Sequence, residues 1–172
     1  VTQSALPQAL KAMYPTDAHA TESQYTGQVE RFTGWWDEQR SLKPAWIGIT
    51  GSWRTMNQQT IDDVAELVHQ SLDRGYGIVT GGALGMDYIA TEVAIRRGNP
   101  SKDLRVILPI ESSAYMAHYG HTADQSPGHK GNRIHISQGS NLADQIYYLK
   151  THHPESLFEV DDCTKYADTL EK

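Results

Sequence analysis

Two stretches decide the fold of this chain: Trp46-Ile47-Gly48-Ile49-Thr50-Gly51-Ser52 and Ile78-Val79-Thr80-Gly81-Gly82-Ala83-Leu84-Gly85-Met86-Asp87. Each is a short apolar run that ends in glycine, and the second continues into a helical pattern. A strand followed by a glycine turn and a helix N-terminus is how α/β proteins hold phosphate groups. Glycine lets the backbone approach an anion closely, and the first N–H groups of the helix point at it.

The surrounding sequence alternates strand and helix patterns. Apolar runs predict strands over 45–50, 76–80 and 104–110, and helical periodicity predicts a helix in each interval. Right-handed crossovers then give a parallel sheet. We expect an α/β, Rossmann-like three-layer protein with the central strand order two, one, three. Residues 45–172 form the predicted nucleotide-binding domain.

An N-terminal helical extension is predicted for residues 1–44. Aromatic and apolar residues recur there at helical spacing, including Tyr25, Val29, Phe32 and Trp36. Apolar side chains outside the three strands should also be buried from solvent: Trp35 and Trp36 in this extension, and Leu157 and Phe158 near the other end of the sequence. With only three clear strands in the sheet, these groups predict self-association, and so a homo-oligomer.

Composition narrows the classes of partner. The chain has 172 residues, 15 basic and 21 acidic, with a formal net charge of −6. This balance disfavours a nucleic-acid surface that works by bulk phosphate attraction. The single cysteine, Cys163, excludes an intramolecular disulfide, and no apolar run approaches the roughly 20 residues of a membrane span. No secretory signal pattern precedes Tyr14, so we expect a cytoplasmic protein with no membrane partner.

The glycine turns also carry a family resemblance. Gly51, Ser52 and Arg54 after the first strand match a Gly-Ser-x-Arg turn, and Gly81, Gly82, Gly85, Met86 and Asp87 match a second glycine motif. With these motifs, residues 45–110 resemble the SLOG superfamily. This Rossmann-like group joins the bacterial DNA-processing protein A and the LONELY GUY nucleotide phosphoribohydrolases.

The resemblance implies binding of a nucleotide or related phosphorylated small molecule at the two turns. It also implies two alternatives: hydrolysis of the N-glycosidic bond of nucleoside monophosphates, and handling of single-stranded DNA. The phosphoribohydrolases carry a later Pro-Gly-Gly-x-Gly-Thr-x-x-Glu motif that this chain lacks, because Ser137-Gln138-Gly139-Ser140 does not match it. Catalytic residues are therefore left unassigned, and the acidic net charge disfavours the DNA alternative.

The predicted binding residues are those of the two turns: Gly51, Ser52, Arg54, Thr80, Gly81, Gly82, Ala83, Leu84, Gly85, Met86 and Asp87. Arg54 offers a charged planar fork suited to phosphate, although a solvated loop arginine explains it equally well. Asp87 is able to accept a hydrogen bond from a ribose hydroxyl. Its alternative role is to stabilise the helix dipole at the first turn. A bulky residue at Gly82 is expected to block phosphate more than it disturbs folding.

Other polar residues are weaker candidates. Glu92 lies five positions after Asp87, so the two carboxylates do not share one helix face. Glu111 follows the third strand, where a surface glutamate is the commoner explanation. His118 and His121 lie in a stretch interrupted by glycine and proline, which disfavours a zinc site. We therefore expect no metal and no cofactor.

Overall fold

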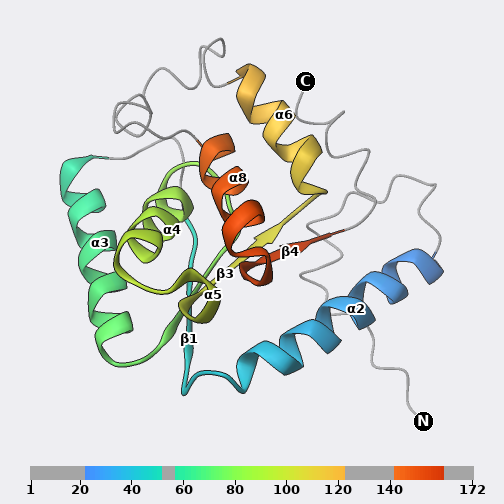
Figure 1. Ribbon diagram of the computed structural model, residues 1–172, viewed down its shortest axis with the longest axis horizontal. Helices are drawn as coiled ribbons and strands as arrows, with labels where there is room; N and C mark the ends of the chain where they lie inside the picture. The colour runs from blue at the N-terminus through green and yellow to red at the C-terminus, as the bar shows by residue number, and fades with distance from the viewer. Residues whose placement is uncertain (1–21, 52–56, 123–141, 161–172) are drawn as a thin grey trace.

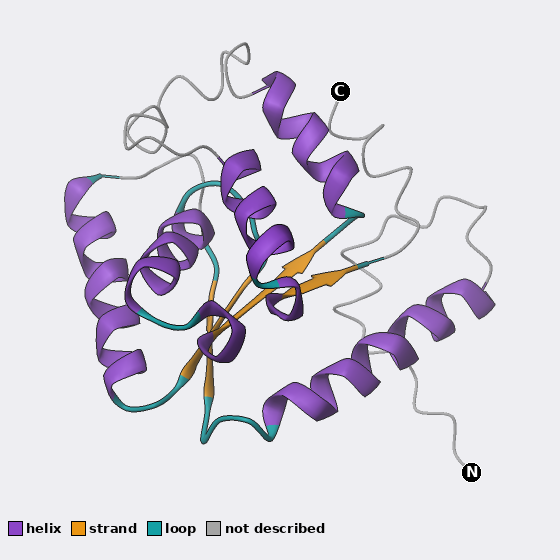
Figure 2. Cartoon of the chain, viewed as in Figure 1, coloured by secondary structure: helices purple, strands orange, loops and turns teal. Residues whose placement is uncertain are grey.

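The computed structural model describes residues 22–51, 57–122 and 142–160. Their elements follow in the order α2 (Glu22–Arg40), β1 (Trp46–Ile49), α3 (Gln58–Asp73), β2 (Gly77–Thr80), α4 (Met86–Arg97), α5 (Pro100–Asp103), β3 (Leu104–Leu108), α6 (Ser112–Thr122), α8 (Leu142–His152), the 3-10 turn η2 (Pro154–Ser156) and β4 (Leu157–Glu159). Helices alternate with strands (Figures 1 and 2). The three predicted strands and the N-terminal helix are present. Residues 133–137, whose sequence also predicts a short strand, lie outside the described residues.

Within the described residues the sheet has four parallel strands in the order β1-β2-β3-β4. Trp46 pairs with Gly77, Ile78 with Leu104, and Val106 with Leu157. The predicted parallel centre is confirmed, but the predicted order two, one, three is wrong. The right-handed rule fixes the hand of each crossover and not its direction across the sheet. Here every crossover moves the chain one strand further the same way.

The fourth strand comes from the polar C-terminal region. The strand β4 follows η2 directly and pairs with β3. The apolar residues Leu157 and Phe158 therefore belong to a short edge strand of the described sheet. Three residues are too few to show a strand period in the sequence.

The two faces of the sheet differ. Leu104, Val106 and Leu108 of β3 are fully buried in a core shared with α4 and α8. The intervening Arg105 instead bonds Gln39 of α2. Because successive side chains of a strand point to opposite faces, α2 covers the face away from α4 and α8. Figure 1 shows α3, α4 and α8 grouped together and α2 apart from them.

Aromatic side chains attach α2 to the sheet. The Trp35 ring lies 4.8 Å from the ring of buried Phe158, and the Trp36 ring lies 6.0 Å from that of Trp46. Phe32 meets Phe158 edge-on at 5.3 Å. The apolar groups that suggested self-association therefore cover one another within the chain. None of the helices in the described residues has the length and apolar character to cross a membrane.

Candidate functional site at the carboxyl ends of β1 and β2

The two glycine turns lie next to each other. Ile49 pairs with Thr80 at the last position of the β1–β2 register, so Thr50 and Gly51 emerge beside Gly81. Thr50, Gly51 and Gly81 are exposed, whereas the two neighbours of Gly81 in the chain, Thr80 and Gly82, are buried. The helix α4 begins five residues later, and its N-cap, Gly85, makes no side-chain cap hydrogen bond. Backbone polar groups are thus presented at one edge of the sheet.

Gly82 serves the core. Its φ is +68°, and a Cβ built on it would lie 2.6 Å from Leu108 Cδ2 and 3.0 Å from Val106 Cγ1. The expectation that a side chain at Gly82 would fill ligand space is therefore wrong, because that direction is occupied by the core. Gly85, with φ +84°, is the second residue of the turn in the left-handed half of the backbone map.

Gly51 lies under a methionine. A Cβ on Gly51 would be 2.1 Å from Met86 Sδ, so glycine here lets the first helical side chain of α4 rest on the end of β1. Met86 is itself half-buried. Methionine side chains are unbranched and flexible, which suits a group that covers a surface and is able to move.

Asp87 lies between both turns. Its side chain is only 1% exposed, and Oδ2 accepts a hydrogen bond from the Gly81 N–H at 2.7 Å. Burial raises the pKa of Asp87, while the backbone N–H groups of Gly81, Gly51, Asp87 itself and Ala83 act against that rise. Oδ1 is also buried, and no hydrogen bond from the described residues reaches it. Asp87 is therefore a buried carboxyl with one oxygen satisfied.

The structure brings together only some of the predicted site residues. Gly51, Gly81, Met86 and Asp87 meet at the edge described above. Thr80 turns into the core, where its hydroxyl lies 2.8 Å from that of Thr91. The remaining turn residues have structural roles. The Gly82 carbonyl accepts a hydrogen bond from the Tyr115 hydroxyl at 3.0 Å. Leu84 and Gly85 are buried, and Ala83 is half-buried. Ser52 and Arg54 lie outside the described residues.

The other two carboxylates have structural partners. Glu92 Oε1 accepts from Arg96 at 2.7 Å, and its Oε2 accepts from Gln145 at 3.1 Å. Glu111 is the N-cap of α6 and accepts from the backbone N–H of Ser113. The Ser113 hydroxyl is the main reason that the pKa of Glu111 falls to about 2. In the described ranges no cluster of histidine, cysteine, aspartate and glutamate is suited to a metal, and His121 lies in a part whose side chains are not described.

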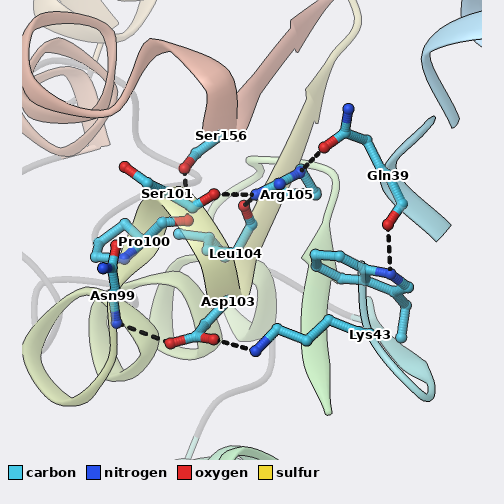
Figure 3. A network of polar contacts seen from close by, with 10 residues as sticks. Gln39, Lys43, Asn99, Pro100, Ser101, Asp103, Leu104, Arg105 and Ser156 are labelled. Carbon is cyan, nitrogen blue, oxygen red and sulfur yellow. Dashed lines mark hydrogen bonds and ion pairs between the residues drawn. The ribbon is translucent and has the colours of Figure 1, made fainter. Parts of the chain in front are cut away.

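A buried arginine at the opposite end of the sheet was not predicted. Arg105 is 1% exposed and donates to Gln39 Oε1 at 2.8 Å, to the Ser101 carbonyl at 2.9 Å and to the Leu104 carbonyl at 2.6 Å (Figure 3). Its guanidinium also lies 5.0 Å from the centre of the Trp46 ring. Burial lowers the pKa of Arg105, and the charges of Glu155 and Asp103 oppose that change. A lone arginine inside an apolar strand is the signal that could have revealed it.

Comparison with known protein families, with curated proteins and with solved structures finds no match to this chain. The likeness to the SLOG superfamily thus rests on the glycine motifs, and the function must be argued from the site.

Proposed function

We propose that the protein binds a nucleotide or a related phosphorylated small molecule at the carboxyl ends of β1 and β2. One observation carries this proposal: Gly51 and Gly81 are exposed beside each other, next to the N-terminus of a 12-residue helix with no side-chain cap. Exposed glycine backbone permits close approach of a ligand, and helix N-terminal N–H groups favour its anionic part.

The position of Asp87 divides this site into two parts. A phosphate on the Gly81 N–H would displace or oppose the carboxylate that already accepts from it. The phosphate is therefore assigned to the β1 side, where Ser52 and Arg54 follow Gly51 in the sequence. Arg54→Ala is expected to weaken nucleotide binding by about 1.5–3 kcal/mol, the usual contribution of a hydrogen bond to a charged group.

Two glycines of the same segment provide the main test. The atoms nearest to a Cβ at Gly51 all belong to the flexible side chain of Met86, whereas no atom of the described residues lies within 4 Å of a Cβ at Gly48. Gly51→Ala places a methyl group on the exposed edge and shifts the thioether, so it should weaken binding about tenfold, or roughly 1.4 kcal/mol. Gly48→Ala should bind as the wild type does. Titration calorimetry with the four ribonucleoside monophosphates measures both.

The proposal fails if none of these nucleotides binds, or if folded Gly51→Ala binds them as well as the wild type. The same samples separate the two alternatives that the resemblance raised. Free adenine released from AMP would indicate an N-glycosidic hydrolase. A salt-dependent mobility shift of a single-stranded oligonucleotide would indicate DNA handling.

Self-association remains part of the proposal, but on different grounds. β1 is an edge strand of the described sheet, and its residues carry neither charge nor proline to discourage pairing. We expect a homo-oligomer by light scattering. Gly48→Lys, which puts a charge at an exposed β1 position, should shift it toward monomer. A wild-type monomer throughout the micromolar range would contradict this.

A further inference from the structure

The carboxyl group of Asp87 has an acceptor oxygen that the fold leaves unused. Oδ2 is occupied by the Gly81 N–H at 2.7 Å. Oδ1 is also buried and accepts no hydrogen bond from the part of the chain that the structure describes, although the N–H groups of Gly51 and Ala83 are close enough to influence the carboxyl. Buried polar atoms are nearly always paired, so an unpaired one at a candidate site points to a missing donor.

We infer that Asp87 Oδ1 is the sugar-binding group of this site and accepts hydrogen bonds from the ribose hydroxyls of the ligand. This inference rests on the proposed nucleotide binding and specifies which part of the nucleotide lies where. The three observations behind it are the unpaired oxygen, its place in the first turn of α4, and the exposed backbone of Gly51 and Gly81 next to it.

The chemistry of a carboxylate selects the kind of group that is bound. An ionised carboxylate only accepts hydrogen bonds, so its partner must be a donor. A phosphate group offers oxygens and negative charge, which a buried carboxylate repels. Neighbouring hydroxyls of a ribose are neutral donors of suitable size. No charged side chain of the described residues acts on Asp87, so its selectivity is set by burial and by backbone N–H groups.

Met86 provides the route to this oxygen. Its side chain rests on Gly51, whose N–H also acts on the Asp87 carboxyl, so the thioether lies beside the β1 turn that contacts Asp87. Rotation of an unbranched, half-buried side chain opens that place without moving the backbone. Binding of a ribose would replace the methionine contact with hydroxyl hydrogen bonds.

The deciding variant is Asp87→Asn. It has the same shape, and its amide oxygen is able to accept from the Gly81 N–H while the NH2 group takes the position of Oδ1. The acceptor for the ribose is thereby replaced by a donor. Glu92→Gln is the matched control, because this second carboxylate of α4 is bonded to Arg96 and Gln145.

The experiment compares the four ribonucleoside monophosphates with their 2′,3′-dideoxy analogues by titration calorimetry. We expect the wild type and Glu92→Gln to bind the best ribonucleotide at least about tenfold more tightly than its analogue, which is 1.4 kcal/mol. Folded Asp87→Asn should bind both equally. A wild type without preference, or a preference that survives in folded Asp87→Asn, overturns the inference and leaves the proposed function intact. If Asp87→Asn does not fold, the wild-type preference decides alone. Absence of binding by every nucleotide overturns both.

Discussion

The two ends of the sheet each hold a buried charged side chain, and the two side chains differ in their hydrogen-bond partners. At the amino end, Arg105 is enclosed by α2, α5 and β1, and three oxygens accept its N–H groups. Around it, Lys43 forms an ion pair with Asp103, and the Ser156 hydroxyl bonds the Pro100 carbonyl at 2.7 Å (Figure 3). At the carboxyl end, Asp87 is equally buried, but one of its oxygens has no hydrogen-bond partner within residues 22–51, 57–122 and 142–160.

This difference separates a structural charge from a candidate binding group. A buried charge that is bonded to acceptors on several elements holds those elements together, and here it joins α2 to the sheet. A buried carboxyl with an incomplete set costs stability, so its retention favours a function. The carboxyl ends of parallel strands are also the edge at which ligands bind in open α/β sheets.

The largest effect is expected for Gly82→Val. The new side chain would overlap Leu108 and Val106, and its backbone φ of +68° is unfavourable for a β-branched residue. Overpacking costs about 1–3 kcal/mol and the strained backbone another 1–3 kcal/mol. Against a typical total of about 5–15 kcal/mol, this should bring the chain close to unfolding at room temperature.

Urea denaturation followed by circular dichroism measures the Gly82→Val effect. Gly48→Ala is the control because no described residue has an atom within 4 Å of a Cβ at that position. If Gly82→Val unfolds at the wild-type urea concentration, the turn does not pack on the core as described. The turn at the carboxyl end of β2 would then not be packed against Leu108 and Val106.

Arg105→Met should produce the next largest effect. Methionine fills much of the space but leaves the acceptors of Gln39, Ser101 and Leu104 without this donor. Hydrogen bonds to charged groups contribute about 1.5–3 kcal/mol each, and partial replacement by water reduces the sum, so we expect a loss of about 2–4 kcal/mol. Tryptophan fluorescence should also change, because the guanidinium lies over Trp46. A variant as stable as the wild type would show that Arg105 does not fasten α2.

The strand and helix positions were predictable because they depend on local patterns. Continuous apolar runs marked β1, β2 and β3, and Pro44 marked the end of the helical extension before the first strand. Strand order was not predictable, because no local pattern states in which direction a crossover moves. The three-residue β4 was too short to carry a period of its own.

The sequence predicts which segments form the candidate site, but not the direction of their side chains. The glycine pattern marks both turns, yet it does not distinguish a glycine beside an exposed edge from one packed against the core, as Gly51 and Gly82 are. The unpaired oxygen of Asp87 depends on the three-dimensional arrangement of Gly51, Gly81 and α4. Its first-turn position in the sequence left a ribose contact and a helix-dipole role as alternatives.

A smaller effect is expected in the pH dependence of stability through Asp87. Burial raises the folded-state pKa above the ordinary value of 3.8, so folding makes ionisation of this carboxyl less favourable than it is in the unfolded chain. This contribution to stability is complete below the unfolded pKa and is lost as pH rises through the higher folded value. Asp87→Asn should remove that loss, so unfolding experiments should find it no less stable than the wild type at pH 7. A wild type that gains stability relative to Asp87→Asn as pH rises would contradict the assignment.

The smallest effect concerns Glu111, the second carboxylate at the same edge, which differs from Asp87 in having its partners. Its oxygens accept from the backbone N–H groups of Ser113 and Ala114 at 3.1 and 3.3 Å, and the Ser113 hydroxyl lowers its pKa to about 2. The resulting stability is present above the unfolded value of 4.5 and is lost as pH falls through about 2. Because the side chain is exposed and screened by solvent, Glu111→Gln should cost only about 0.5 kcal/mol at pH 7. The stability difference between Glu111→Gln and the wild type should shrink toward pH 2. As pH falls, the wild type therefore loses stability relative to Glu111→Gln, whereas it gains stability relative to Asp87→Asn.

Lys150→Met tests the weaker ion pair at 3.4 Å separately and should leave this pH dependence nearly unchanged. If Glu111→Gln differed from the wild type by the same amount at pH 2 and pH 7, the carboxylate would not be the capping group. The contrast between a satisfied and an unsatisfied carboxylate at this edge would then have to be abandoned.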